Sequence, residues 1–247
     1  MRVGAFILCC LLFIACENSK NKTAESEKTE LMNDTVSGLF NLKYPSGQVK
    51  ETGMLIQGRK NGIWKNFDEN GNLLSAAYYY KNEKVVDIEK EDFIFTKVLC
   101  DDISINLPSK WTTKKNYKQA LVLAVKPVSS DTVFAPTINV LQVEIPTGID
   151  FPQFVIANKK DLANNYQEIK FKEEKELSIA GNRAYEMLYF VKADNQKLAV
   201  LATYVQKGNS CYIITCIAEG KGEEYVKYND LFKEITLSLN FTASQAS

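Results

Sequence analysis

Four apolar stretches follow one another in the second half of the chain, and only short polar turns separate them. The stretches cover about 169–178, 183–192, 197–206 and 210–219, and the turns contain Gly, Asn or Asp. Turns this short connect antiparallel neighbours. Residues 198–205 and 212–218 are apolar or small at nearly every position, which is typical of strands covered on both faces. The pattern therefore predicts an antiparallel meander buried between two layers.

Two amphipathic helices are predicted to form these layers. Asp150 precedes Phe151-Pro152, which indicates an N-cap followed by a proline in the first turn. This helix extends to about residue 166, and a second one covers about 223–237. Apolar residues recur at helical spacing in both, so each has one face that can cover the sheet. They are Phe151, Phe154, Val155, Leu162 and Tyr166 in the first, and Tyr225, Tyr228, Phe232, Ile235 and Leu239 along the second.

Three more strands precede the first helix, and a proline ends each of them. They cover about 103–107, 121–125 and 138–145, and Pro108, Pro127 and Pro146 follow. With the meander and the helices, they predict an α+β domain, an antiparallel β-sheet sandwiched between helices, over residues 88–241. Residues 242–247 remain as a tail.

A small all-β ribbon is predicted before this domain, over residues 38–87. Glycines recur 24 residues apart, Gly38 with Gly62 and Gly47 with Gly71, and short aromatic stretches lie between the turns. Such spacing predicts two repeated β-hairpins. Two repeats bury too little surface alone, so we expect the ribbon to lean on the following domain or on a partner. A charged link, 87–92, leads out of it.

The N-terminus is predicted to be a targeting signal. An apolar run ends at Ala15 and is too short to span a bilayer, and a polar segment follows Cys16 at once. Residues 1–15 resemble a bacterial lipoprotein signal, which implies acylation of Cys16 and a membrane as a partner. An ordinary secretory signal cleaved near Ala15, or an uncleaved anchor, is the alternative. Residues 16–37 are polar enough to form a disordered tether.

Charge and composition exclude several functions. The chain has 30 basic and 30 acidic residues, and 29 and 30 remain without residues 1–15. This balance disfavours a nucleic-acid partner, which requires a basic face. The chain contains no histidine, so Ser-His and Cys-His nucleophiles, His metal sites and His proton shuttles are excluded.

Few side chains remain as candidates for chemistry, and each has a structural interpretation. Asp101-Asp102 could bind a cation, but a solvated turn is the more common role of such a pair. Trp111 is expected to pack at the edge of the sheet. If it were exposed, it could anchor a partner. Cys100 could form a disulfide with Cys211 or Cys216, or all three could be buried thiols. We predict no catalytic, cofactor or metal site.

Two further family resemblances rest on short motifs. Gly62-x-Trp64 and the Asn70-Gly71 turn resemble MORN-type repeats over residues 38–86. Ile103-Ser-Ile-Asn-Leu-Pro-Ser-Lys-Trp111 and Ala180-Gly-Asn-Arg-Ala184 resemble the PsbP/DcrB-like family over about 93–241. The second likeness implies an antiparallel sheet between helices, and relatives that are accessory or binding proteins rather than enzymes.

The sequence therefore predicts a non-enzymatic accessory or binding protein, anchored by lipid in the bacterial cell envelope and with a protein partner. An immunity or antitoxin-type protein is one alternative. Another is a carrier of a small apolar ligand held between the sheet and a helix.

Overall fold

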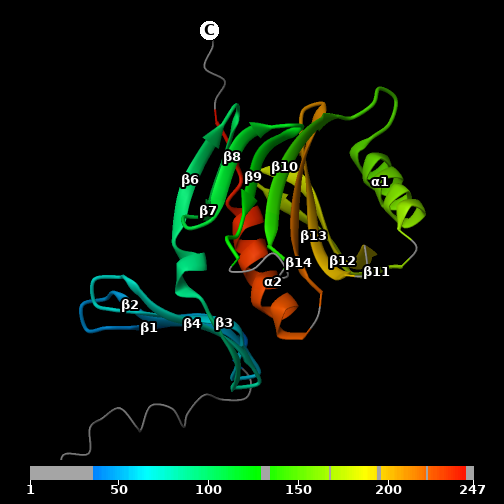
Figure 1. The fold of residues 1–247 in the computed structure, drawn as a ribbon. Coiled ribbons are helices and arrows are strands. Elements are labelled where there is room, and N and C mark those ends of the chain that lie inside the picture. Colours follow the sequence, from blue (N-terminus) through cyan, green and yellow to red (C-terminus); the bar gives the residue numbers. More distant parts are fainter. Residues whose placement is uncertain (1–35, 129–133, 167, 194–195, 221, 243–247) are drawn as a thin grey trace, which may run out of the picture.

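The computed structural model describes residues 36–128, 134–166, 168–193, 196–220 and 222–242 (Figure 1). The first described element is a five-stranded antiparallel sheet in the order β1-β2-β3-β4-β5. Its strands are β1 (Gly38–Lys43), β2 (Val49–Ile56), β3 (Arg59–Phe67), β4 (Leu73–Tyr80) and β5 (Glu83–Ile88). We call this sheet the ribbon; a short 3-10 helix, η1 (Lys90–Phe93), follows it.

Two of the three position pairs that lie 24 residues apart in the ribbon share a backbone conformation, whereas Gly38 and Gly62 differ, with φ values of 135° and 75°. Gly47 and Gly71 have φ values of 87° and 83°, and Gly58 and Asn82 have values of 69° and 74°. On one face, the Trp64 indole is fully buried, packs near Phe40 and donates its Nε1–H to the Met54 carbonyl oxygen at 3.2 Å. A Cβ at Gly53 would overlap this ring, so the close approach requires glycine there.

The main body is a seven-stranded antiparallel sheet in the order β11-β12-β13-β14-β10-β9-β8. Its strands are β8 (Thr112–Tyr117), β9 (Ala120–Val125), β10 (Thr137–Glu144), β11 (Ile169–Ile179), β12 (Asn182–Ala193), β13 (Gln196–Lys207) and β14 (Ser210–Glu219). A three-stranded sheet in the order β15-β7-β6 completes the body. It comprises β6 (Phe95–Cys100), β7 (Ile103–Pro108) and β15 (Asn240–Phe241).

Two helices cover opposite faces of the seven-stranded sheet (Figure 1). Helix α1 (Phe151–Asn165) packs Phe151, Phe154 and Val155 against one face. Helix α2 (Gly222–Leu237) and the three-stranded sheet share the core on the other face, where Leu231 and Ile235 are fully buried. The predicted α+β class, an antiparallel sheet between helices, is confirmed.

Asp150 caps the N-terminus of α1, as the sequence predicts. Asp150 accepts a hydrogen bond from the Gln153 backbone N–H at 2.8 Å, and the Gln153 side chain accepts one from the Asp150 N–H at 3.0 Å. This reciprocal capping satisfies two backbone donors that the helix itself leaves free.

The ribbon leans on α2, as its small size predicts. Ile63, Leu73 and Tyr78 pack against the core that α2 and the three-stranded sheet share. Two polar contacts join the same elements: Lys65 Nζ lies 2.6 Å from Glu234 Oε2, and the Ile63 N–H donates to Asp230 Oδ2 at 3.3 Å. The ribbon therefore buries part of one face against the helix.

The charged link between ribbon and body has regular structure. It contains the end of β5 and η1, and its Asp92 side chain is buried, with the residue 2% exposed. Asp92 Oδ1 accepts from Trp111 Nε1–H at 2.8 Å, and Asp92 Oδ2 accepts from Lys126 Nζ at 2.7 Å. Lys126 also donates to Glu89 at 2.8 Å. We call Asp92, Trp111 and Lys126 the buried clamp.

The clamp ties four parts of the chain together. Trp111 is buried and contacts Tyr228 of α2 edge-on, with ring centroids 6.4 Å apart, and Lys126 lies over the same ring. Burial alone would lower the pKa of Lys126, but the hydrogen bonds to Asp92 and Glu89 outweigh it and raise that pKa above its ordinary value. The clamp thereby fixes η1 against β9 and α2.

Asp92→Ala should lower the free energy of unfolding by about 3–5 kcal/mol, because it leaves the Lys126 charge and the Trp111 N–H buried without this partner. Urea unfolding followed by tryptophan fluorescence measures this change. Glu89→Ala is the control, since that carboxylate is exposed and its removal should cost less than about 1 kcal/mol. Equal effects of the two substitutions would contradict the clamp.

Candidate functional site

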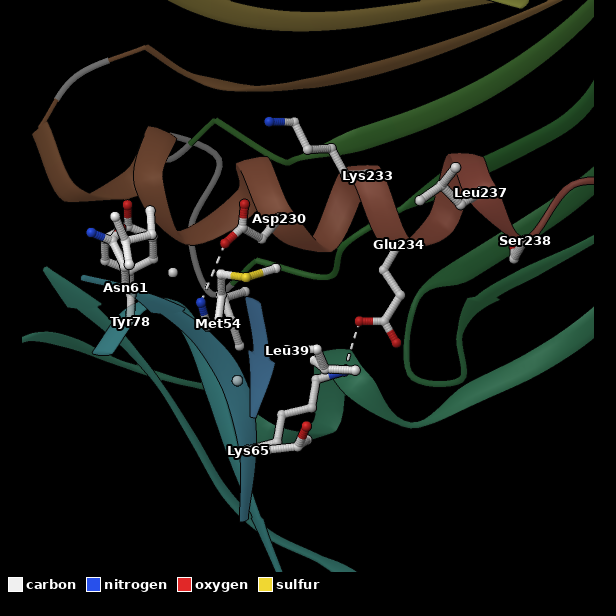
Figure 2. A pocket seen from close by; sticks show the side chains of 15 residues that line it. Leu39, Met54, Asn61, Lys65, Tyr78, Asp230, Lys233, Glu234, Leu237 and Ser238 are labelled. Carbon is white, nitrogen blue, oxygen red and sulfur yellow. Dashed lines mark hydrogen bonds and ion pairs between the residues drawn. The ribbon is translucent and has the colours of Figure 1, made fainter. Parts of the chain in front are cut away.

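An open groove lies between the ribbon and the C-terminal half of α2 (Figure 2). It has a volume of about 750 Å³, and its walls come from β1 to β4 on one side and from Asp230–Ser238 on the other. We call it the ribbon–helix groove. The two walls lie nearly 180 residues apart in the chain and meet only because the ribbon packs on α2.

Part of the groove lining is unusually apolar for an exposed surface. Leu39 of the ribbon is 70% exposed, Leu237 of α2 is 58% exposed, and Ile56 and Met54 are 49% and 43% exposed. Side chains alternate along each strand, so Leu39 and Met54 project to the α2 face while Phe40 and Leu55 project to the Trp64 face. The apolar face of the ribbon therefore extends beyond what the helix covers.

Charged side chains form the opposite part of the groove and hold its two walls together. Lys65 pairs with Glu234, and its ammonium also lies 4.3 Å from the centroid of the Phe93 ring. Asp230 points from α2 towards the ribbon (Figure 2), where its Oδ2 accepts a hydrogen bond from the Ile63 N–H. Both contacts cross the junction between ribbon and α2, so they fix the width of the groove.

Asp230 is an anionic group in a partly buried place. Burial raises the pKa of its carboxyl group above the ordinary value, and the nearby charge of Glu173 adds to the rise. Lys233 and hydrogen bonds from the Ile63 N–H and from Asn229 oppose the rise without cancelling it. Deprotonation of Asp230 in the folded state therefore carries a free-energy cost.

Cys16, the one site residue that the sequence predicts, lies outside the described residues, so its acylation stays a prediction. The other candidates are described. Asp101 has a φ of 49° in an exposed turn, and Asp102 accepts a hydrogen bond from the Tyr212 hydroxyl. Within the described part of the chain, no group of three or more Cys, Asp or Glu side chains could hold a metal ion.

Trp111 and the cysteines have structural positions. Trp111 is buried in the clamp and is not exposed to anchor a partner. Cys100, Cys211 and Cys216 are buried free thiols rather than members of a disulfide. Burial raises the pKa of Cys211 to about 12, so its thiol stays protonated at neutral pH.

Sequence reasoning missed the groove. Gly53, an isolated glycine within a strand, indicates close approach of another group, and that group is the Trp64 ring. It marks the Trp64 face, however, and not the groove itself. Of the described helices, neither is long and apolar enough to cross a membrane.

The chain has little detectable sequence similarity to known proteins. No protein-family model matches this chain, and no curated protein matches it. Several solved structures resemble part of it. Cyanobacterial PsbP (CyanoP) from Synechocystis is 12% identical, covers 60% of this chain and 92% of its own, and has a TM-score of 0.46.

The other two structures come from different bacteria. LpqN of Mycobacterium tuberculosis, described as involved in cell envelope biogenesis, is 15% identical over 60% of this chain and 91% of its own, with a TM-score of 0.46. The immunity protein TplEi of Pseudomonas aeruginosa is 7% identical over 83% of this chain and 76% of its own, with a TM-score of 0.33. At these identities and scores, none of the three likenesses assigns a function to this chain.

Asp230→Asn should remove a pH dependence of stability. Because the folded-state pKa is raised, the carboxylate destabilises the fold above that pKa, and this cost disappears as the pH falls through it towards the ordinary value of about 3.9. The variant should be at least as stable as the unaltered protein at pH 7, and the difference should vanish by about pH 4.

Urea unfolding at a series of pH values tests this. The amide oxygen can still accept the hydrogen bond from Ile63, so the junction is preserved. A variant that is clearly less stable at pH 7, with an unchanged pH profile, would contradict the assignment.

Proposed function

We propose that this chain is an envelope lipoprotein, anchored through an acylated Cys16, whose ribbon–helix groove binds a protein partner without catalysing a reaction. The observation that carries the proposal is the apolar part of the groove lining. Four large apolar side chains, Leu39, Met54, Ile56 and Leu237, are between 43% and 70% exposed around one open depression. Apolar patches with a polar rim mark interaction sites on soluble domains.

A protein segment fits the groove better than a small apolar ligand does. The groove is open along its length, and its charged rim offers Lys233 and Glu234 to a partner's polar groups. By contrast, the described space between α2 and the seven-stranded sheet measures only about 10 Å³, about the volume that one water molecule needs. A ligand carried between sheet and helix would have no room there.

The ionisable side chains of the groove support binding rather than catalysis. Lys65 and Glu234 pair with each other, and Asp230 accepts a hydrogen bond from the backbone of β3. Each therefore has a structural partner across the junction. General acid-base chemistry needs such groups aimed at a substrate position.

We further propose that the ribbon consists of two MORN-type repeats. The matching φ values of Gly47 with Gly71 and Gly58 with Asn82 support two copies of one hairpin unit. In this interpretation the repeats provide one wall of a partner site, and α2 provides the other.

Cys16→Ser should abolish acylation of the chain. Cells expressing the full chain are fed a palmitate analogue, and the label on the purified protein is measured. Cys9→Ser and Cys10→Ser are matched controls, because these residues lie in the signal and should leave the label intact. Label that persists on Cys16→Ser, or disappears from a control, would refute the proposed anchor.

Leu39→Lys with Met54→Lys should disrupt partner binding at least about tenfold, because two desolvated apolar contacts are replaced by charges. A photo-crosslinking residue at Leu237, in the full-length protein in its own envelope, reports capture of one defined partner. Leu74→Lys is the control, since Leu74 is comparably exposed but lies outside the groove. Equal capture by the double variant and the unaltered protein would exclude the groove.

A further inference from the structure

A second surface lies beside the start of α2, on the α2 face of the seven-stranded sheet. It is an open depression of about 470 Å³, formed by the neighbouring ends of β11, β12 and β13. We call it the basic shelf. Its charged and aromatic members are Glu168, Lys170, Lys172, Phe190, Lys192 and Lys197.

Strand register concentrates positive charge on this shelf. Lys192 of β12 lies directly opposite Lys197 of β13, and Lys170 of β11 lies opposite Phe190. Like charges opposite each other destabilise a sheet. Glu168 pairs with Lys192 at 3.0 Å, whereas Lys170, Lys172 and Lys197 form no ion pair with a described residue. Among the described residues, the shelf therefore has three lysines without an ion-pair partner, and an anionic surface would relieve their repulsion.

The shelf lies beside the N-terminal end of α2. β14 leads through Gly220 into α2, and the Gly220 N–H donates to the Lys197 carbonyl oxygen at 2.7 Å, so the shelf and the start of α2 are neighbours (Figure 1). The ribbon meets α2 further along the helix, at Asp230 and Glu234, and its Tyr78 packs against the same core as Tyr225, which lies nearer the helix start. The Gly58 N–H donates to the carbonyl oxygen of Val36, the first described residue, at 2.7 Å, so the described chain begins on the ribbon.

The proposed anchor would hold the membrane close to the ribbon, and therefore close to the body on which the ribbon packs. As the tether predicted from its composition, the segment between Cys16 and Val36 would have an r.m.s. length of about 25 Å. Lysines near an anionic bilayer gain about fivefold in binding for each residue, and this attraction acts only within about a Debye length. A body held this close can therefore be oriented by three lysines.

We propose that the basic shelf rests on the anionic headgroups of the membrane that holds Cys16, and so orients the body. This inference rests on the proposed lipid anchor. The shelf is open, and its lysines are exposed on three separate strands, which suits many loosely held phosphate groups in a plane. A site for one small phosphate would be enclosed and would hold buried donors.

Energy transfer to a lipid-headgroup dye tests the orientation. The acylated full-length protein carries one introduced cysteine, either Gln196→Cys beside the shelf or Asn209→Cys at the far end of β13. These positions are about 40 Å apart along the strand. Cys100, Cys211 and Cys216 are buried, so the introduced thiol takes the fluorophore. Vesicles contain phosphatidylcholine with phosphatidylglycerol, or phosphatidylcholine alone.

In anionic vesicles, the dye at residue 196 should transfer more energy than the dye at residue 209, and the difference should vanish in neutral vesicles. K170E/K172E/K197E should reduce the shelf-down population at least about tenfold. K114E/K115E/K118E is the matched control, since these exposed lysines lie on and beside β8, at the other edge of the sheet, and the orientation should survive.

The possible outcomes distinguish failure of the shelf proposal from failure of the proposed anchor. Protein that floats with anionic vesicles but shows equal transfer from both positions overturns the shelf proposal and leaves the anchor standing. Protein that floats with neither kind of vesicle refutes the anchor, and the shelf proposal falls with it. Orientation that inorganic phosphate abolishes, while chloride at the same ionic strength does not, shows a small-phosphate site and also overturns the proposal.

Discussion

The buried carboxylate of Asp92 is the constraint on which the remaining arrangement depends. A charge in such a place is tolerated only when it is paired and hydrogen-bonded, and here an indole N–H and a lysine ammonium satisfy it. Its partners come from the segment after β7 and from the end of β9, and both contact Tyr228 of α2. The carboxylate therefore specifies how η1 enters the body. Because η1 directly follows the ribbon, the same contact sets the position at which the ribbon meets α2.

Helix α2 packs against both the seven-stranded sheet and the ribbon, and the groove results from these two contacts. One face supplies Leu231 and Ile235 to the core of the seven-stranded sheet. Another contacts the ribbon through Asp230 and Glu234, which accept from β3. The ribbon has too few strands to bury both of its faces, so it uses the helix for one of them. The helix is narrower than the ribbon face, and the apolar positions on β1 and β2 are left uncovered.

Sequence patterns predicted the elements that bury apolar surface, and they failed where polar residues form structure. The meander strands and both helices were predicted within a few residues of their ends, because alternation and helical spacing report burial directly. β8 was missed because Thr112–Tyr117 is exposed at every position and has no apolar signal. Asp92 lay in a run of charges that indicates a solvated link, and its burial depends on Lys126 and Trp111. The groove has no local signal, because its walls, near residues 54 and 234, meet only through tertiary packing.

The basic shelf and the ribbon–helix groove lie at different positions along the axis of α2. Gly222 starts the helix beside the basic shelf, and the groove begins at Asp230, eight residues later. At 1.5 Å per residue, this places the groove about 12 Å further along the helix axis. If the shelf lies on the headgroups, the groove opens above the bilayer surface instead of against it. The exposed apolar side chains of Leu39 and Leu237 would then face a partner in the aqueous phase, at a fixed height. A tether alone would leave that height undefined, so the anchor, the shelf and the groove make a consistent arrangement only together.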